Sequence, residues 1–530
     1  MCGLFGSLSP IVKNSNFNEI FNQLNYRGPN DTEIKHVSND VTLGFHRLSI
    51  MDTSDHGNQP FYDKERGIYL LCNGEIYNYH QYFEIYKDVY PFQSKSDCEV
   101  ILPLYRQYGL PEMCKRLDAE FALVLYDENT NQMFAARDPI GIRPLFYGKS
   151  KLDGKMMFAS EAKVLIPYCE KVIPFPPGQY YDGEFKSYEK ISEVKKFNQD
   201  SEELILKQIR EKFIEGVKKR LMSDVPIGFL LSGGLDSSLV CAVAAQILKK
   251  PITTFSVGLN KNPIDLPYAK MVADFLKTNH HEVYFTEEDT LKVVREVIWH
   301  LETWDITTIR ASIGMYLVCK YIHEKTKIKV LLTGEISDEL FGYKYTDFAP
   351  SGDEFQKEAT KRIDELYFYD VLRADRCISA HSLEARVPFG DIDFVKYVMS
   401  IPGEKKMNKT GMGKNLLRKA FDGFNYLPSE ILWREKAAFS DAVGHSMVDT
   451  LKAEAEKKYQ EIDLESAKIK YPHGTPFTKE SLWYRDIFEE LFPKQGHLTK
   501  DFWMPNKSWS NCNVNDPSAR VLPNYGKSGV

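Results

Sequence analysis

The sequence predicts an α/β protein of two domains: a layered, β-rich first part, and a second part built on a doubly wound parallel sheet. The chain has 530 residues, more than one hydrophobic core usually organises. Short strand-like runs bounded by Gly, Asn and Asp dominate the first part, whereas strand-like and helix-like runs alternate in the second. Proline, glycine and polar residues crowd residues 175–200, as in a linker. We therefore place the domains at residues 2–185 and 201–530.

Composition excludes several functional classes. Lys and Arg number 68 and Asp and Glu 74, so the net charge is −6, and the lack of a long basic run argues against nucleic acid as the main partner. The sequence has neither a signal-peptide pattern nor the run of about 18 apolar residues that a membrane helix needs. Nine cysteines without C-x-x-C pairs favour free thiols in a reducing, cytoplasmic setting, without a zinc site.

In the first part, apolar runs at Ile68–Cys72, Phe121–Tyr126 and Met133–Ala136 predict strands. Many short strands with turns between them indicate layers of β structure covered by helices. Polar clusters such as Asn73–Asn78 follow these strands directly, and strand ends are where site residues tend to be held.

The chain begins Met1-Cys2-Gly3, and because the second residue is small, removal of Met1 would leave a cysteine with a free α-amine. Removal would leave Cys2 with a thiol of pKa about 8.5 beside its own α-amine of pKa about 8. One residue would then supply both a nucleophile and its base. In an unprocessed chain the Cys2 nitrogen is an amide and cannot accept the proton. The alternative interpretation is an ordinary cysteine at a frayed end.

The second part opens with a predicted helix capped by Ser201, with Glu202 and Glu203 in its first turn. Strands and helices then alternate, which predicts a mostly parallel, doubly wound sheet with ligands at the carboxyl ends of its strands. The expected strands are 227–231, 253–259, 282–285 and 328–332, and the expected helices are 239–248, 269–276, 289–300 and 311–323.

The loop Phe229–Ser238 lies between the first of these strands and its helix. Two glycines turn the backbone so that free N–H groups point at one spot near a helix N-terminus, which favours an anion. It has neither of the two common nucleotide-loop patterns, and it contains an acid, Asp236, among Ser232, Ser237 and Ser238. Because a carboxylate cannot hold phosphate directly, we expect a divalent cation between them.

A second polar loop, Thr333–Glu339, follows the predicted strand 328–332. It carries three acids within five residues: Glu335, Asp338 and Glu339. They would repel each other and a bound phosphate unless Mg²⁺ offset the charge, and the alternative is a solvated charge run.

Segments of the first part resemble the class II glutamine amidotransferases, which have an αββα N-terminal-nucleophile hydrolase fold. These segments are MCGLFG (1–6), YRGPN (26–30), GFHRLSI (44–50), LCNGEIYN (71–78), SDCEVI (96–101) and ARDPIGIRPLFY (136–147). The resemblance implies that Cys2 attacks the glutamine amide and that Asn73 and the Gly74 N–H form the oxyanion hole. It also implies a glutamine-binding set comprising Arg47 for the α-carboxylate, Glu75 and Asp97 for the α-ammonium, and Leu48, Ser49, Ile50, Met51, Asn73 and Gly74.

Segments of the second part resemble the ATP pyrophosphatase domain of glutamine-hydrolysing asparagine synthetases, an α/β domain with a helical C-terminal part. These segments are GFLLSGGLDSS (228–238), TTFSVGL (253–259), TGEISDELFG (333–342), DVLRADRCISAHSLEARVPF (370–389) and ILWREKAAFSD (431–441). The resemblance covers nearly the whole chain. It implies synthesis of L-asparagine from L-aspartate and glutamine through β-aspartyl-AMP, with ATP as substrate and Mg²⁺ as cofactor.

By the same resemblance, Glu335 and Lys436 act in catalysis, and Asp236 and Asp338 hold Mg²⁺ on the pyrophosphate. The implied ATP-binding residues are Leu231, Ser232, Gly233, Gly234, Asp236, Ser237, Val257, Thr333 and Gly334. We expect a cytoplasmic enzyme without nucleic-acid or membrane partners, and a homodimer is the candidate assembly.

The chain also departs from the family pattern. It has Ile336 and Asn30 where the family usually has Gly and Asp, Gly390 where it has Leu, and Glu435-Lys436-Ala437 where it has Pro-Lys-Glu. If position 336 needs φ > 0, a β-branched residue there is a misfit. Two alternatives therefore stay open: a related adenylating amidotransferase for another acid, or a non-catalytic amino-acid-binding or regulatory protein.

Overall fold

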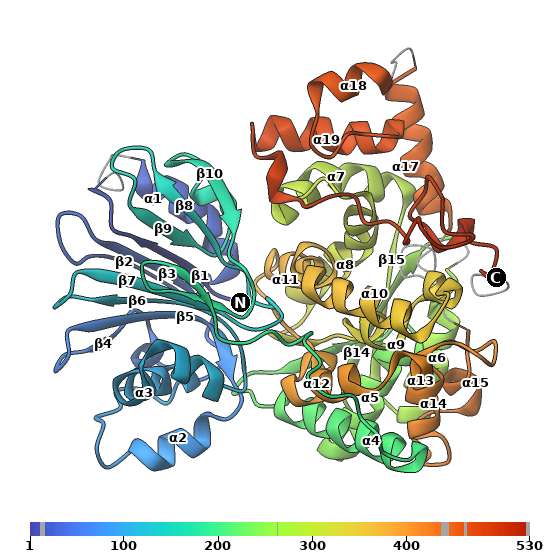
Figure 1. The fold of residues 1–530 in the computed structure, drawn as a ribbon, viewed down its shortest axis with the longest axis horizontal. Coiled ribbons are helices and arrows are strands. Elements are labelled where there is room, and N and C mark those ends of the chain that lie inside the picture. The colour runs from blue at the N-terminus through green and yellow to red at the C-terminus, as the bar shows by residue number, and fades with distance from the viewer. Residues whose placement is uncertain (11–15, 262, 436–444, 461–463, 526–530) are drawn as a thin grey trace. The chain divides into compact units, whose positions relative to one another are not determined.

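The computed structural model describes residues 1–10, 16–261, 263–435, 445–460 and 464–525, which form two compact units (Figure 1). Unit 1 comprises Met1–Ile191, Met222–Pro226 and Ser379–Glu384. Unit 2 comprises Ser192–Leu221, Ile227–Ile378 and Ala385–Val530. Two short segments that come after Ile191 in the chain thus also belong to the first unit.

Unit 1 contains two six-stranded sheets, and every pairing resolved between its strands is antiparallel. The first sheet has the order β10 (Cys169–Pro174), β8 (Phe146–Ser150), β9 (Met156–Ala159), β1 (Gly3–Ser7), β3 (Thr42–Arg47) and β2 (Asp31–His36). The second has the order β12 (Phe185–Ser187), β11 (Gln179–Tyr181), β7 (Gln132–Arg137), β6 (Ala119–Asp127), β5 (Ile68–Ile76) and β4 (Phe61–Asp63). The predicted strands at 68–72, 121–126 and 133–136 are β5, β6 and β7, each longer than predicted. Strand β5 continues through Asn73–Ile76, which were expected to follow the strand and instead form its last part.

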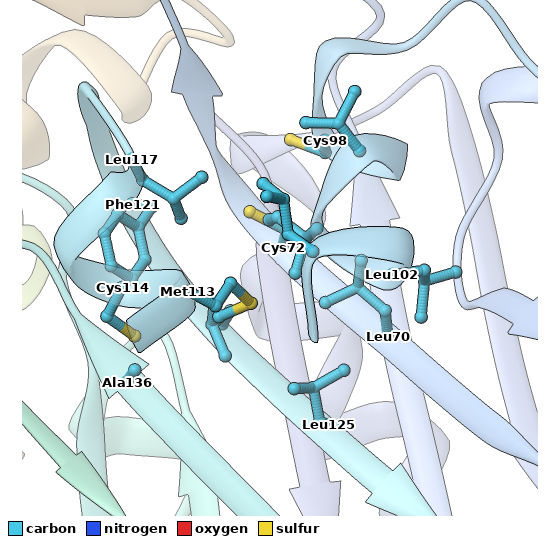
Figure 2. Packing of buried hydrophobic residues seen from close by; sticks show 14 of the residues in the cluster. Leu70, Cys72, Cys98, Leu102, Met113, Cys114, Leu117, Phe121, Leu125 and Ala136 are labelled. Carbon is cyan, nitrogen blue, oxygen red and sulfur yellow. The ribbon is translucent and has the colours of Figure 1, made fainter. Parts of the chain in front are cut away.

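Successive residues of β5 pack on opposite faces of the second sheet, because side chains alternate along a strand. Tyr69 and Leu71 belong to a cluster with Leu4 and Phe45 of the first sheet, so this face lies between the sheets. Leu70 and Cys72 belong instead to a cluster with α3 (Ile101–Arg116) and α2 (Tyr79–Tyr86). Figure 2 shows part of this second cluster, in which Leu70, Cys72 and Leu125 of the strands gather with Leu102, Met113 and Cys114 of α3.

Helix α1 (Phe17–Phe21) and the 3₁₀ segment η2 (Asn22–Arg27) cover the outer face of the first sheet. The ring of Phe5 on β1 lies 4.8 Å from that of Phe17 and 6.2 Å from that of Phe21, centroid to centroid. With α2 and α3 on the other side, the layers are helix, sheet, sheet, helix. The predicted αββα architecture is confirmed.

Unit 2 is built on a five-stranded sheet with the order β15 (Asn279–Phe285), β14 (Thr253–Leu259), β13 (Ile227–Leu230), β16 (Val330–Leu332) and β17 (Glu384–Arg386). The pairs of β13 with β14 and β16, and of β14 with β15, are parallel, which confirms the predicted parallel sheet. The chain order reverses between β13 and β16. In doubly wound sheets, ligands bind at such a switch point, beyond the carboxyl ends of the strands.

The helices of unit 2 include those predicted, with earlier starts. Helix α4 (Glu202–Lys219) begins at the predicted cap, where the Ser201 hydroxyl accepts a hydrogen bond from the Leu204 N–H at 3.3 Å. Helix α5 begins at Leu235 rather than 239, so Asp236 lies in its first turn. Helices α5–α12 are α5 (Leu235–Leu248), α6 (Leu266–Leu276), α7 (Glu287–Leu301), α8 (Ile306–Lys325), α9 (Ser337–Phe341), α10 (Gly352–Glu365), α11 (Asp370–Ser379) and α12 (Ile392–Ser400).

The C-terminal part of unit 2 is helical, as predicted. It contains α13 (Gly403–Lys406), α14 (Asn415–Phe421), α15 (Ser429–Leu432), α17 (His445–Lys458), α18 (Leu464–Lys470) and α19 (Lys479–Leu491). Helices α17 and α19 pack on each other and on α7 (Figure 1). Over the described ranges, each helix is either too short or too polar to span a bilayer.

Candidate functional site

Cys2 lies immediately before β1, and contacts from three separate segments of unit 1 hold it. Its backbone N–H donates to the Asn73 Oδ1 at 2.9 Å, and its carbonyl accepts from the Arg27 Nε at 2.9 Å. The Leu48 N–H points at the Cys2 Sγ at 3.4 Å. The structure therefore brings Cys2 together with the predicted residues Leu48 and Asn73, and with Arg27, which belongs to the YRGPN segment but was not predicted as a site residue.

Asn73 and Gly74, the predicted oxyanion donors, lie on β5. The Asn73 Nδ2 is buried and has no hydrogen-bond partner among the described residues, so it is available to a ligand beside Cys2. The N–H groups of Cys72 and Ile76 leave the strand pairing and donate to the side chains of Gln59 (2.7 Å) and Asp97 (2.6 Å). Because alternate N–H groups of a strand share an edge, the Gly74 N–H points the same way, between these two bonds.

The titrating groups at the start of the chain are tuned mainly by loss of solvent. Burial lowers the pKa of the Met1 amine to about 6, while nearby Glu384 acts in the opposite direction. Desolvation raises the pKa of the Cys2 thiol, offset in part by the terminal amine and by the Leu48 backbone. Both shifts belong to the chain that still carries Met1, and the raised pKa of the thiol means that it needs a base to ionise at neutral pH.

The predicted glutamine-binding loop follows Arg47 at the end of β3. The Arg47 guanidinium is buried and donates to the Ser54 carbonyl at 2.6 Å, to the Asn58 Oδ1 at 2.7 Å and to the Asp52 carbonyl. Asn30, the residue that departs from the family pattern, accepts the Ser49 N–H at 3.0 Å. Ile50 and Met51 complete the loop and are buried. These bonds hold the loop 47–51 in a fixed shape beside Cys2.

The two acids predicted for the α-ammonium group lie close together. Glu75 on β5 and Asp97 on η4 (Asp97–Val100) are both buried. Burial raises the pKa of Tyr79 to about 12, and the charges of Asp97, Asp224 and Glu75 all add to that rise. Asp224 belongs to the returning segment Met222–Pro226 and was not predicted. Its sequence neighbours carry no motif, so local sequence offered no signal for it.

In unit 2 the loop after β13 turns at Gly233, where φ is +73°. A Cβ at this residue would lie 2.4 Å from the Ala269 nitrogen, so only glycine fits. The Ser232 and Ser237 hydroxyls lie 3.0 Å apart, and the Ser237 hydroxyl also accepts the Ser232 N–H at 3.1 Å. Ser238 differs from the expectation, because it is fully buried and does not line the cavity.

The loops after β13 and β16 meet at the switch point of the sheet. A Cβ on Gly334 would lie 2.8 Å from the Ser237 nitrogen, which shows how closely the two loops approach. A cavity opens between them, and Gly233 does not line it. The predicted residues that line it are Leu231, Ser232, Gly234, Asp236, Ser237, Val257, Thr333, Gly334, Glu335 and Asp338.

The ammonium group of Lys414 lies between the two carboxylates predicted to hold Mg²⁺. Its Nζ is 2.8 Å from both carboxylate oxygens of Asp236, 2.6 Å from the Asp338 Oδ1 and 3.0 Å from the Ser337 hydroxyl. The lysine is buried, so its single positive charge offsets part of the charge of these two acids. Sequence analysis missed Lys414, which stands 178 residues from Asp236 without a recognisable motif.

The other acids of the β16 loop have separate partners. The Arg373 Nη2 donates to Glu335 at 2.9 Å and to Asp370 at 2.7 Å, at the wall of the cavity. Burial, reinforced by Asp370 and Asp338, raises the pKa of Glu339 well above its usual range. Burial and the neighbouring acids therefore disfavour a charge on Glu339.

Ile336 stands at φ +80° and ψ −20°, immediately before α9, and its side chain is buried. The premise that this position needs a positive φ is therefore confirmed. A β-branched residue in this region carries strain of about 1–3 kcal/mol. The loop keeps its shape because Gly334 on one side and the Leu340 N–H bond to the Ile336 carbonyl (3.2 Å) on the other constrain it.

Lys436 and Ala437 lie outside the described residues, so the predicted role of Lys436 stays a prediction. The neighbouring Arg434 is described: it donates to the Gly233 carbonyl at 3.0 Å and to Asp265 at 2.8 Å. The segment that precedes Lys436 is thus hydrogen-bonded to the loop after β13.

Comparison with known proteins agrees with both halves. A family model described as "Asparagine synthase" matches residues 208–359 and 347–515, and one described as "Glutamine amidotransferase domain" matches residues 1–181. The probable glutamine-hydrolysing asparagine synthetase of Schizosaccharomyces pombe is 43% identical over 528 residues, covering 94% of each chain. The enzymes so named from Gallus gallus and Homo sapiens are 42% and 40% identical over 544 and 548 residues, covering 95% of each chain.

These identities agree with the sequence motifs and with the αββα and parallel-sheet architectures. They also agree with the placement of Cys2 and with the cavity between the loops after β13 and β16. The chain belongs to the glutamine-hydrolysing asparagine synthetase family.

Proposed function

We propose that this protein makes L-asparagine from L-aspartate, using ATP to activate the β-carboxylate and L-glutamine as the nitrogen donor. The products are asparagine, glutamate, AMP and pyrophosphate. The observation that carries the proposal is the occurrence of two sites on one chain. Cys2 lies beside Asn73, whose buried Nδ2 has no hydrogen-bond partner among the described residues, and a cavity lies between the loops after β13 and β16. Residues 2–185 would act as the glutaminase domain and residues 201–530 as the synthetase domain.

In the glutaminase reaction, removal of Met1 frees the Cys2 amine, which takes the thiol proton. The thiolate attacks the glutamine side-chain carbonyl, and the Asn73 Nδ2 and Gly74 N–H stabilise the resulting oxyanion. Arg47 binds the α-carboxylate, and Glu75 and Asp97 bind the α-ammonium group. Ammonia leaves as the thioester forms, and water then hydrolyses the thioester to glutamate.

In the synthetase reaction, the aspartate β-carboxylate attacks the α-phosphate of ATP and displaces pyrophosphate. Lys414 is placed to neutralise phosphate charge, because its ammonium already lies between the two loops. Ammonia then attacks the acyl carbon of the β-aspartyl-AMP so formed and displaces AMP. Glu335 is a carboxylate at the cavity wall, and we assign it the removal of the proton that the nitrogen loses. Its ion pair with Arg373 holds it in one orientation.

Asp236 and Asp338 are suited to Mg²⁺, since both carboxylates reach a common point, marked by the Lys414 Nζ. Mg²⁺ is usually held by one or two carboxylates together with phosphate oxygens and water, and this donor set fits that pattern. When bound, the ion would neutralise charge on the pyrophosphate. In this structure the Lys414 ammonium lies at that common point.

The test supplies aspartate, Mg-ATP and amide-¹⁵N glutamine to Met1-processed protein. We expect labelled asparagine and AMP in equal amounts. Cys2→Ala should abolish synthesis from glutamine and keep synthesis from added ammonia. Equal loss of both activities would contradict the assigned division of labour, and AMP formation with another acid but not aspartate would identify a related amidotransferase instead.

The cytoplasm is the proposed location, supported by nine cysteines that form no disulfide. Assembly as a homodimer stays a prediction, which sedimentation velocity would test.

A further inference from the structure

Arg27 is the side chain that holds the carbonyl side of Cys2. It belongs to η2, its guanidinium is fully buried, and its Nε donates to the Cys2 carbonyl at 2.9 Å. The Asn73 Oδ1 holds the N–H of the same residue. With both backbone groups held, the direction of the Cys2 Cα–Cβ bond is set, and with it the path of the thiol towards a bound amide.

Glu161 in turn holds Arg27. The Arg27 Nη1 donates to the Glu161 Oε1 at 2.6 Å, and both side chains are fully buried. The same nitrogen donates to the Ser379 hydroxyl at 3.0 Å, which also belongs to unit 1. Because arginine stays charged in proteins, a buried guanidinium needs an anion to compensate it.

The second oxygen of Glu161 has two further donors. Its Oε2 accepts from the Tyr26 hydroxyl at 2.5 Å and from the Lys163 Nζ at 2.5 Å, and Lys163 also reaches the Tyr26 hydroxyl at 3.0 Å. One buried carboxylate therefore lies between two buried cations. Without its charge, Arg27 and Lys163 would repel each other, and Arg27 would lose its anchor.

The turn that carries Glu161 also forms hydrogen bonds with β1 directly. The Ser160 hydroxyl accepts the Leu4 N–H at 3.0 Å, and the Ser160 N–H donates to the Leu4 carbonyl at 3.0 Å. Cys2 is therefore connected to residues 160–161 through the main chain of β1 and through Arg27.

We propose that Glu161 is a positioning residue for glutamine hydrolysis. It acts through Arg27, which orients Cys2 by its carbonyl, and it touches neither the substrate nor the thiol. This inference rests on the proposed glutaminase function of Cys2.

The test is Glu161→Gln, which keeps the size of the side chain and removes its charge. We expect kcat for glutamine hydrolysis to fall about 10- to 100-fold, the usual cost of a nucleophile misplaced by about 1 Å. KM for glutamine should stay within about threefold, since the groups assigned to bind glutamine are unchanged. Synthesis from added ammonia should keep its wild-type rate, and alkylation of Cys2 by iodoacetamide should slow in parallel with kcat.

Lys163→Met is the matched control, because it removes a cation from the same carboxylate and leaves the bond between Glu161 and Arg27. It should keep kcat within about threefold of wild type. Glu161→Asp, which retains the charge, should recover part of the lost rate. If Glu161→Gln does not fold, Arg27→Lys tests the same link, because lysine can pair with Glu161 but lacks the Nε donor, and it should lower kcat with little change in KM.

Three results would overturn the proposal: a wild-type kcat in Glu161→Gln or in Arg27→Lys, an equal loss in Lys163→Met, or a parallel fall of the glutamine- and ammonia-dependent activities. The last result would mean that Glu161 only stabilises the fold. A wild-type protein without any glutaminase activity would instead contradict the proposed function.

Discussion

Replacement of Asn73 by alanine is the most direct test of the glutaminase site, because the structure separates the two tasks of this side chain. The Oδ1 accepts the Cys2 N–H at 2.9 Å, and the buried Nδ2 has no partner in the described part of the chain. The first task orients the nucleophile. The second leaves a donor for the charge that develops on the substrate oxygen.

The expected magnitude follows from these two contacts. Loss of one oxyanion donor costs about 10²–10³ in kcat, or about 3–4 kcal/mol. Loss of an ordinary hydrogen bond to the Cys2 nitrogen adds about 1 kcal/mol, or about fivefold. Asn73→Ala should therefore lower kcat for glutamine hydrolysis by about 10³-fold. Asn73→Asp keeps the acceptor but replaces the donor by an anion, so its loss should be at least as large.

The assay measures glutamate release for the glutaminase reaction and pyrophosphate release with added ammonia for the synthetase reaction. Both variants should keep the ammonia-dependent rate. Asn78→Ala is the matched control, since Asn78 follows β5 on the same segment and bonds the Arg116 carbonyl rather than Cys2. It should retain glutaminase activity within about twofold. A kcat for Asn73→Ala within about threefold of wild type would refute the assignment of its amide to the oxyanion hole.

Three further predictions follow from buried or strained residues. Lys414→Met removes the cation between Asp236 and Asp338, so it should destabilise unit 2 by about 3 kcal/mol in thermal unfolding. It should also abolish AMP formation while glutamine hydrolysis persists. If added Mg²⁺ stabilises this variant more than it stabilises the wild type, the result would support the cation site. At Ile336, where φ is +80°, the glycine variant should be about 1 kcal/mol more stable than the alanine variant in denaturant unfolding. This is the reverse of the order in a helix, where alanine is the more stabilising residue. An alanine variant more stable than the glycine variant would contradict the strain at this position. Burial lowers the pKa of His46 to about 4, below the unfolded value of about 6.5, so its contribution to stability is present above pH 6.5 and is lost as the pH falls towards 4. His46→Gln should therefore lose about 2 kcal/mol less than wild type between pH 7.5 and 5, and equal losses would show that another group controls the acid sensitivity.

Several elements could be predicted from the sequence because their signals are local. The run Thr253–Leu259 is a strand with the predicted bounds, and Ser201 caps α4 as its residue type suggests. Helix α5 was predicted to start four residues too late. Its first turn carries Asp236 and two serines, which are typical of a loop, but Gly234 in an extended conformation caps the helix before them. Polar residues at a helix N-terminus therefore concealed the boundary.

The sequence by itself determined the chemistry of this protein: the thiol at Cys2, the Asn73-Gly74 pair, and two loops whose glycines and acids indicate a phosphate site. These features depend on residues close together in the chain, so their spacing is visible. Only the tertiary structure decided which distant groups complete each site. Lys414 pairs with Asp236 across 178 residues, Glu161 reaches Arg27 across 134, and Asp224 returns to the acids of unit 1. A buried charge needs a partner, and the fold supplies that partner from a segment that is distant in the sequence. A local sequence pattern therefore does not reveal which residue it is.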